Sequence, residues 1–127
     1  MSKWKRNVAV VLGASAAAVA LSAAPAQAFV GRFIYTTTNA DCTFAGGNGV
    51  SNGVFASYSC DSGIAGYSLH VLPTTTSFND VYINTFASDT DCNWAGTNGK
   101  PAAGQPTIWY SYRCISGVAG WSLHVTG

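Results

Sequence analysis

The segment that decides the fold is 58–71, which reads YSCDSGIAGYSLHV and occurs again at 112–125 as YRCISGVAGWSLHV. A shorter block precedes each copy, DCTFAGGNG at 41–49 and DCNWAGTNG at 91–99. The short blocks are offset by 50 residues and the long blocks by 54. The chain therefore contains an internal repeat, and its second copy has four extra residues in a proline-containing stretch where we expect a surface loop.

The residue pattern within each copy predicts a strand, a short helix and two further strands. Residues 32–38 and 81–86 are rich in aromatic and β-branched residues, which is typical of strands. Asp41 and Asp91 are predicted to cap a helix of one or two turns that ends at a glycine. Alternating residues predict the remaining strands, at 54–60, 67–71, 107–114 and 121–125.

The predicted fold class is β-rich α+β. It consists of two tandem β-short α-β-β repeats with about six antiparallel strands, one disulfide per repeat and a pseudo-twofold relation between the repeats. The first repeat spans 29–75 and the second spans 76–127. We expect both to pack around one core as a single compact domain.

Alternation also assigns side chains to the faces of each strand, because side chains two residues apart point the same way. Phe55 and Trp109 fall on the face opposite the cysteine of their strand. With Phe44 and Trp94 of the helices they would be partly exposed unless another layer covers them, and these four residues and Phe29 form the predicted binding surface. The alternative is a two-sided core in which the short helix covers this face. The side chains placed in the core are Phe33, Tyr35, Tyr67, Leu69, Val71, Trp121, Leu123 and Val125.

Residues 1–28 have the layout of a secretory signal peptide. Three basic residues precede an apolar stretch from Val8 to Ala24, and the small residues at 26 and 28 form a cleavage site. We expect cleavage before Phe29 and secretion to the extracellular space. The alternative is a membrane anchor, but the stretch is mostly alanine and is interrupted by Gly and Ser, which suits a hydrocarbon core of about 30 Å poorly.

Export changes the charge of the chain, because the signal holds three of its six basic residues. The remaining three face five Asp residues and no Glu, which gives the mature chain a net charge of about −2. Binding to nucleic acid or to anionic lipid depends on clusters of Lys and Arg, and the sequence after the signal has none. We therefore expect neither nucleic acid nor a membrane as a partner.

The four cysteines lie after the signal, and an even number in a short secreted chain is typical of disulfides. Because each copy has one cysteine in each block, we expect the pairs Cys42–Cys60 and Cys92–Cys114. Each pair closes a loop of about 20 residues and contributes roughly 3 kcal/mol in the chain-entropy model. A domain-swapped arrangement with crossed pairs is the alternative. A zinc site is disfavoured, because no Cys-x-x-Cys knuckle is present.

Repeated serine and histidine residues raise the question of catalysis. Ser68 and His70 are two residues apart in one strand, as are Ser122 and His124. Their Cα atoms would lie about 6.5 Å apart with parallel side chains, whereas a triad needs direct hydrogen bonds and a third orienting group. The sequence also lacks the Gly-x-Ser-x-Gly elbow. We therefore expect no catalytic residue and no enzyme.

Metal binding and acid-base catalysis have one candidate pair each. His70 and His124 could approach each other across a pseudo-twofold axis, but a tight site needs three or four ligands. Asp41 and Asp91 could act as the acid and base of a glycosidase, but helix capping explains their position better. We expect no metal and no cofactor.

The repeated Asp-Cys and Ser-Gly-x-Ala-Gly-x-Ser-Leu-His-Val blocks, with the alanine-rich signal, resemble the short two-repeat secreted proteins of Streptomyces-like actinobacteria. In size, export and duplication the chain is also similar to the small adaptors of umbrella-shaped antibacterial toxin particles. This resemblance covers residues 29–127 and implies an adaptor that bridges a repeat-containing toxin and a lectin-like subunit. It carries no functional residue over to this chain.

The sequence predicts a secreted, non-enzymatic module that binds another extracellular protein. Its role would be that of an adaptor in an extracellular assembly or an inhibitor of an extracellular enzyme. One alternative is a carbohydrate-binding module that uses Trp94, Trp109 and Trp121 as stacking platforms, and another is a small hydrolase. Aromatics in a flat row with polar residues between them favour sugar, and a patch around an open strand edge favours protein.

Overall fold

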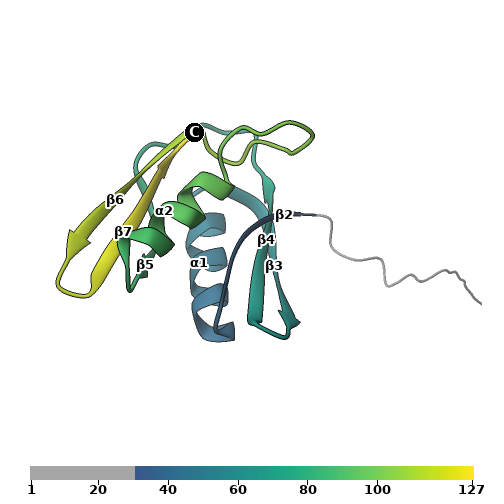
Figure 1. Cartoon of the computed structure of the whole chain (residues 1–127). Coiled ribbons are helices and arrows are strands. Elements are labelled where there is room, and N and C mark those ends of the chain that lie inside the picture. Colours follow the sequence, from purple (N-terminus) through teal and green to yellow (C-terminus); the bar gives the residue numbers. More distant parts are fainter. Residues whose placement is uncertain (1–30) are drawn as a thin grey trace, which may run out of the picture.

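The fold consists of two halves with the same order of elements, a strand, a helix and two strands (Figure 1). The computed structural model describes residues 31–127, so the predicted signal at 1–28 lies outside the described residues. The first half contains β2 (Arg32–Thr37), α1 (Asn39–Ser51), β3 (Phe55–Gly63) and β4 (Gly66–Pro73). The second half contains β5 (Val81–Phe86), α2 (Asp89–Asn98), β6 (Ser111–Gly117) and β7 (Gly120–Thr126).

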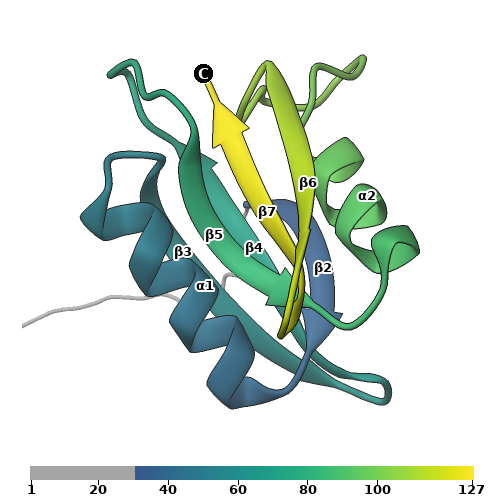
Figure 2. The same ribbon diagram turned by 90° about the vertical axis from the view of Figure 1, so that its left-hand side faces the viewer.

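Each half forms its own three-stranded antiparallel sheet. The strand orders are β2-β4-β3 and β5-β7-β6, so the last strand of each half lies in the middle of its sheet. In the view of Figure 2, α1 and α2 lie on opposite sides of the strands. The two sheets, two helices and two disulfides of the described residues confirm the predicted β-rich α+β class.

The helices begin three residues earlier than predicted. Thr38 is the N-cap of α1 and Ser88 is the N-cap of α2. Their hydroxyl oxygens accept hydrogen bonds from the backbone N–H groups of Asp41 and Asp91, at 3.2 and 3.1 Å. The prediction that the two Asp residues are the caps is therefore wrong. Both carboxylates lie in the first helical turn instead, where the helix dipole favours negative charge.

The helices are also longer than predicted, with 13 residues in α1 and 10 in α2. The predicted stop signals, Gly46 and Gly96, lie inside the helices and are buried. Glycine in a helix interior costs roughly 1 kcal/mol relative to alanine, so something else must favour it here. The strands supply the reason, because a Cβ at Gly46 would overlap the Tyr58 ring and a Cβ at Gly96 would overlap the Tyr112 ring.

The same kind of contact buries Phe55 and Trp109, which are 2% and 0% exposed. A Cβ at Gly49 would overlap the Phe55 ring, and a Cβ at Gly99 would overlap the Trp109 ring. The prediction that these two aromatics belong to an exposed surface is therefore wrong, and the helices cover this face. Alternation misplaced them because the register shifts between Phe55 and Ser57, and because Trp109 precedes β6.

One cluster of buried side chains runs through both halves. Leu69, Val71, Leu123 and Val125 are fully buried, which confirms the core face predicted for the last strand of each half. Tyr67 and Trp121 are only partly buried and pack against the cluster.

Each helix also contacts the first strand of the other half. Both first strands have a register shift, one at Ile34 and one at Ile83, which leaves a residue outside the regular ladder. Asn48 of α1 donates through Nδ2 to the Ile83 carbonyl at 3.2 Å, and Asn98 of α2 donates to the Ile34 carbonyl at 2.6 Å. Each half thus supplies the hydrogen bond that the irregular strand of the other half requires.

A disulfide joins each helix to the sheet of its own half. Cys42 of α1 is bonded to Cys60 of β3, and Cys92 of α2 is bonded to Cys114 of β6. The predicted pairing is confirmed, and the crossed pairing is wrong. Two disulfides in so small a domain are compatible with an extracellular location. Among residues 31–127, no helix is long and apolar enough to cross a membrane.

Candidate functional site

The aromatic side chains predicted as a binding surface divide into two groups. Phe44 and Trp94 lie on the outer sides of the helices and are 49% and 47% exposed. Phe55 and Trp109 are buried beneath those helices, and Phe29 lies outside the described residues. The structure therefore leaves one exposed aromatic side chain on each helix.

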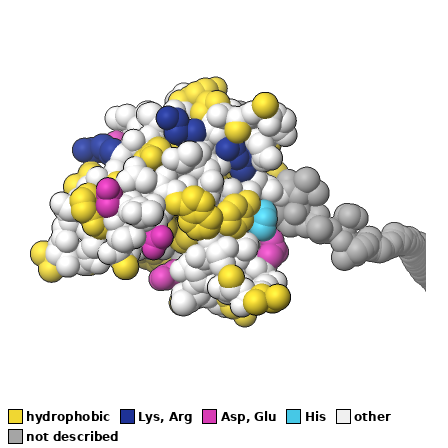
Figure 3. Space-filling model, viewed as in Figure 1, with side chains coloured by type: hydrophobic (Ala, Val, Ile, Leu, Met, Phe, Trp, Pro, Cys, Tyr) yellow, Lys and Arg dark blue, Asp and Glu magenta, His cyan; other side chains and the backbone are white. Residues whose placement is uncertain are grey.

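Trp94 belongs to a row of rings that crosses from one half of the molecule to the other. Its ring centroid is 5.7 Å from that of Phe33 in β2, and the Phe33 centroid is 5.7 Å from that of His70 in β4. We call Trp94, Phe33 and His70 the Trp94 patch. Figure 3 shows hydrophobic side chains gathered near the centre of one face, beside a histidine and close to acidic side chains.

An equivalent row starts from the other helix. The Phe44 ring centroid is 6.4 Å from that of Tyr82 in β5, and the Tyr82 centroid is 5.7 Å from that of His124 in β7. We call Phe44, Tyr82 and His124 the Phe44 patch. The two patches have the same construction, because Phe33 pairs with His70 in one sheet and Tyr82 pairs with His124 in the other.

The position of Phe33 differs from the one predicted from the sequence. Alternation predicts Phe33 and Tyr35 in the core, but two residues of a strand share a face only when no register shift separates them. The register shift at Ile34 buries Ile34 and Tyr35 and leaves Phe33 only partly buried, in the Trp94 patch. The prediction is therefore right for Tyr35 and wrong for Phe33.

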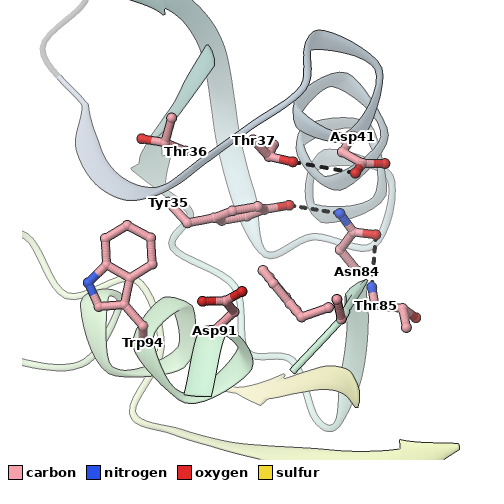
Figure 4. Close-up of a pocket in the computed structure, with 10 residues that line it drawn as sticks. Tyr35, Thr36, Thr37, Asp41, Asn84, Thr85, Asp91 and Trp94 are labelled. Carbon is pink, nitrogen blue, oxygen red and sulfur yellow. Dashed lines mark hydrogen bonds between the residues drawn. The ribbon is translucent and has the colours of Figure 1, made fainter. Parts of the chain in front are cut away.

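A cavity of about 260 Å³ lies between the two halves and includes Trp94 in its lining (Figure 4). In it, Asn84 donates through Nδ2 to the Tyr35 hydroxyl at 2.8 Å, and Asn84 Oδ1 accepts the Thr85 N–H at 2.8 Å. Tyr35 and Asn84 are buried. The lining residues are Tyr35, Thr36, Thr37, Asp41, Asn84, Thr85, Phe86, Ala87, Asp91 and Trp94.

Tyr35 contributes no charge to this cavity at neutral pH. The pKa of Tyr35 is raised to about 12, chiefly because the ring is buried; the hydrogen bond from Asn84 opposes this rise, and the Asp41 carboxylate adds to it. The negative charge of the cavity therefore comes from the two exposed carboxylates in its lining, Asp41 and Asp91. The sequence predicts these two residues as separate helix caps, whereas in the structure both line one cavity.

Within residues 31–127, no basic side chain lines the cavity. Each of the three basic residues within 31–127 contacts a residue that does not line the cavity. Arg32 Nη1 donates to the Pro106 carbonyl at 2.9 Å, Arg113 pairs with Asp80, and Lys100 Nζ lies 6.0 Å from the Tyr112 ring centroid. Over this part of the chain, the charge of Asp41 and Asp91 is not balanced by an ion pair.

The repeated serine hydroxyls form contacts with threonines of neighbouring strands. Ser68 Oγ lies 3.1 Å from Thr36 Oγ1, and Ser122 Oγ lies 3.3 Å from Thr85 Oγ1. Both contacts join the middle strand of a sheet to its first strand. The structure gives these serines a role in cross-strand pairing, and it records no hydrogen bond from either one to a histidine among the described residues.

The two histidines have different carboxylate neighbours. His70 Nδ1 lies 2.8 Å from Asp61 Oδ2, which is within ion-pair distance but outside hydrogen-bond geometry. His124 Nδ1 lies 3.7 Å from Asp80 Oδ1. Over residues 31–127, no group of three or more His, Cys, Asp or Glu side chains is arranged to hold a metal ion.

An ion pair that the sequence analysis did not predict lies on the second half. Arg113 Nε donates to Asp80 Oδ1 at 2.8 Å, and Arg113 Nη2 donates to Asp80 Oδ2 at 2.6 Å. These hydrogen bonds lower the pKa of Asp80 and raise the pKa of Arg113. Asp80 has a φ of 54°, and its backbone N–H donates to Thr126 Oγ1 at 3.0 Å. No spacing rule joins residues 33 positions apart, so only the folded chain shows this pair.

No protein-family model, curated protein or solved structure matches this chain. The two aromatic patches and the cavity between the halves are the candidate functional features of the described residues.

Proposed function

We propose that this chain is a secreted, non-enzymatic protein-binding module that acts as an adaptor in an extracellular assembly or as an inhibitor of an extracellular enzyme. The observation that carries the proposal is the pair of aromatic patches, each of which ends in an exposed ring on a helix. Large aromatic side chains are enriched among the residues that dominate binding energy at protein interfaces. A disulfide joins each of these helices to its sheet, so a partner meets a rigid surface.

The placement of the patches favours the adaptor over the inhibitor. The helices that carry Phe44 and Trp94 lie on opposite sides of the strands in Figure 2. A module with one aromatic patch on each side can contact two proteins at once, whereas an inhibitor needs one contact surface. The resemblance to small adaptors of toxin particles agrees with this interpretation.

The tips of two β-hairpins offer further apolar contacts. The paired residues Gly63 and Gly66 close one two-residue loop, and Gly117 and Gly120 close the other. The loops present Ile64 and Val118, which are both fully exposed. A fully exposed aliphatic side chain does not add to the folding free energy by burial. If a partner covers it, the removal of its apolar surface from water favours binding.

We also infer that the two halves arose by duplication and are related by a pseudo-twofold axis. The repeated sequence blocks, the matched aromatic patches and the reciprocal bonds of Asn48 and Asn98 support this relation. Secretion is inferred from the signal-like residues 1–28 together with the disulfides.

A carbohydrate-binding module is the second candidate, because Trp94 stands beside a cavity lined with hydroxyl, amide and carboxylate groups. Aromatic stacking combined with such polar groups is a chemistry that fits a sugar ring. The burial of Trp109 and the partial burial of Trp121 weaken this candidate. They leave Trp94 as the one half-exposed tryptophan among the three platforms that the sequence predicts.

The test starts from a non-reducing pull-down with the immobilised mature chain and culture supernatant of the source organism. Each captured protein is then purified and its affinity is measured against Trp94→Ala, Phe44→Ala and the control Tyr110→Ala, which changes an exposed residue outside both patches. We expect a loss of about 10- to 100-fold for a patch variant and no loss for the control. Adaptor function predicts two partners, one sensitive to each patch.

Two results would overturn the proposal. One is a captured protein whose affinity neither patch variant changes. The other is a glycan array on which the wild-type chain binds a defined sugar and the Trp94→Ala chain does not, because that outcome assigns the patch to carbohydrate.

A further inference from the structure

The cavity between the halves has room for one side chain. Its volume of about 260 Å³ lies below the roughly 300–1,000 Å³ that is typical of sites for drug-sized ligands. Residues of β2 and α1 line it from the first half, and residues of β5 and α2 line it from the second. Such a cavity takes a single side chain or a single sugar ring.

The charge of the lining favours a cation. Asp41 and Asp91 both contribute carboxylates, and the rest of the lining is neutral or apolar. The one side-chain hydrogen bond recorded for these carboxylates is a long one, in which Thr37 Oγ1 donates to Asp41 Oδ2 at 3.4 Å. Most of the acceptor capacity of both groups is therefore free for a donor from outside the described residues.

An aromatic wall completes the lining. Trp94 is half-exposed, and it is part of both the cavity and the Trp94 patch. In Figure 4, Trp94 and Asp91 lie on the same side of Tyr35, and Asp41 lies on the other side. An indole ring attracts a cation placed over its face, and a neighbouring carboxylate strengthens the preference for positive charge.

We propose that this cavity receives an arginine side chain of the protein that binds the Trp94 patch. A guanidinium group is planar, stacks on an aromatic ring and donates two parallel hydrogen bonds to a carboxylate, so it uses both features of the lining. The proposal rests on the proposed function in one respect, which is that the arginine comes from a partner protein.

Other ligands use this lining less well. Calcium needs six to eight oxygen ligands, and no group of three metal-ligating residues occurs within residues 31–127. The helix dipoles stabilise Asp41 and Asp91 without any ligand, but they do not explain why both carboxylates line the same cavity as a half-exposed tryptophan. A sugar ring would stack on Trp94 without using the net negative charge.

The direct test is a titration of the mature chain with N-acetyl-arginine methylamide, followed by two-dimensional NMR of backbone and indole N–H groups. We expect saturable shifts at Trp94, Asn84 and Thr85, with a dissociation constant on the order of millimolar, because one side chain makes few contacts. N-acetyl-citrulline methylamide is the matched probe, since it has nearly the same shape and no charge. It should bind at least about tenfold more weakly.

Variants of the chain identify the groups responsible. The double change Asp41→Asn with Asp91→Asn should weaken the arginine probe about tenfold or more. Asp89→Asn is the matched control, because Asp89 lies in the same first turn of α2 and does not line the cavity. Trp94→Leu should also weaken the probe, whereas Phe44→Leu, on the equivalent exposed aromatic, should not. The dispersion of each NMR spectrum shows whether a variant is folded.

Three results would overturn the inference. They are equal binding of the arginine and citrulline probes, an undiminished affinity in the folded double Asn variant, and shifts produced by glucose or N-acetylglucosamine but not by the arginine probe. If the affinity of a pull-down partner depends on Trp94 but not on the two Asp residues, the proposed protein-binding function stands and the proposed arginine contact is wrong. If the affinity depends neither on Trp94 nor on the two Asp residues, both proposals are wrong.

Discussion

In both halves of the molecule an aromatic ring from the sheet packs against a helix glycine, and a disulfide fixes the helix there. The surfaces of the two halves differ. Arg113 pairs with His124 in its sheet and binds Asp80, whereas the residue that pairs with His70 in the first half is Ser59. Close packing limits the size of the side chains at the helix-sheet contacts, whereas it does not limit the side chains at the surface. The helix-sheet contacts are therefore alike in both halves, whereas the residues that pair with the two histidines differ in charge.

The largest expected change in stability comes from removal of the disulfides. Comparing the two removals tests whether the halves are equally important for stability. Replacement of Cys42 and Cys60 by Ala should cost roughly 3 kcal/mol of unfolding free energy, and replacement of Cys92 and Cys114 should cost about the same, because the closed loops have similar lengths. Loss of both should unfold a domain whose total stability is typically about 5–15 kcal/mol. Urea denaturation followed by circular dichroism measures each cost, and an unchanged stability after either pair is removed would contradict the comparison.

The helix glycines offer the next largest effect. Gly46→Ala and Gly96→Ala should each destabilise the chain by about 1–3 kcal/mol, because the added methyl group meets a tyrosine ring. Gly47→Ala is the matched control, since a Cβ there meets nothing within 4 Å. That control should stabilise the chain by up to about 1 kcal/mol through helix propensity alone. Equal thermal stability of Gly46→Ala and Gly47→Ala would show that the ring contact does not require glycine.

The contact between Tyr35 and Asn84 joins the halves directly and gives a pH-dependent prediction. Tyr35→Phe should cost about 1–3 kcal/mol at neutral pH, because the buried Asn84 amide loses its acceptor. The pKa of Tyr35 is about 12 in the folded chain and 10.0 in the reference state, so the unfolded state releases the proton first. Stability should therefore fall as pH rises from 10 through 12, and Tyr35→Phe should remove this part of the fall.

Chemical denaturation at pH 8, 10 and 11 checks this prediction, with Tyr110→Phe as the control at an exposed tyrosine. The control should leave both the neutral-pH stability and the pH dependence unchanged. If Tyr35→Phe loses stability at high pH as steeply as the wild-type chain does, the buried hydroxyl is not the group that titrates.

The smallest expected effect concerns the ion pair that distinguishes the second half. Arg113→Gln should change the melting temperature little, because both partners are exposed, and added salt should remove the difference. The pKa of Asp80 lies below its reference value of 3.8, so the contribution of the pair is present above that pH and is lost as the pH falls below it. Wild-type and Arg113→Gln stabilities should converge in acid. A large effect of Arg113→Gln at neutral pH would show that the pair also holds the frame together.

The sequence alone was sufficient for the features that depend on local pattern or on spacing. One cysteine in each block of each copy predicts the two disulfides, because pairing within a copy needs no knowledge of how the copies meet. Alternation predicts Leu69, Val71, Leu123 and Val125 in the core, because β4 and β7 lie in the middle of their sheets and keep a regular register with β3 and β6 over these residues.

Only the tertiary structure decided the length of the helices, the burial of Phe55 and Trp109 and the position of Phe33. A glycine in a helix is a stop signal in local terms, and it becomes favourable only when a ring from a strand occupies the space of its missing side chain. A register shift turns a side chain to the other face without any mark in the alternation. The cavity at Asp41 and Asp91 depends on how the halves meet, since residues some 50 positions apart line it together.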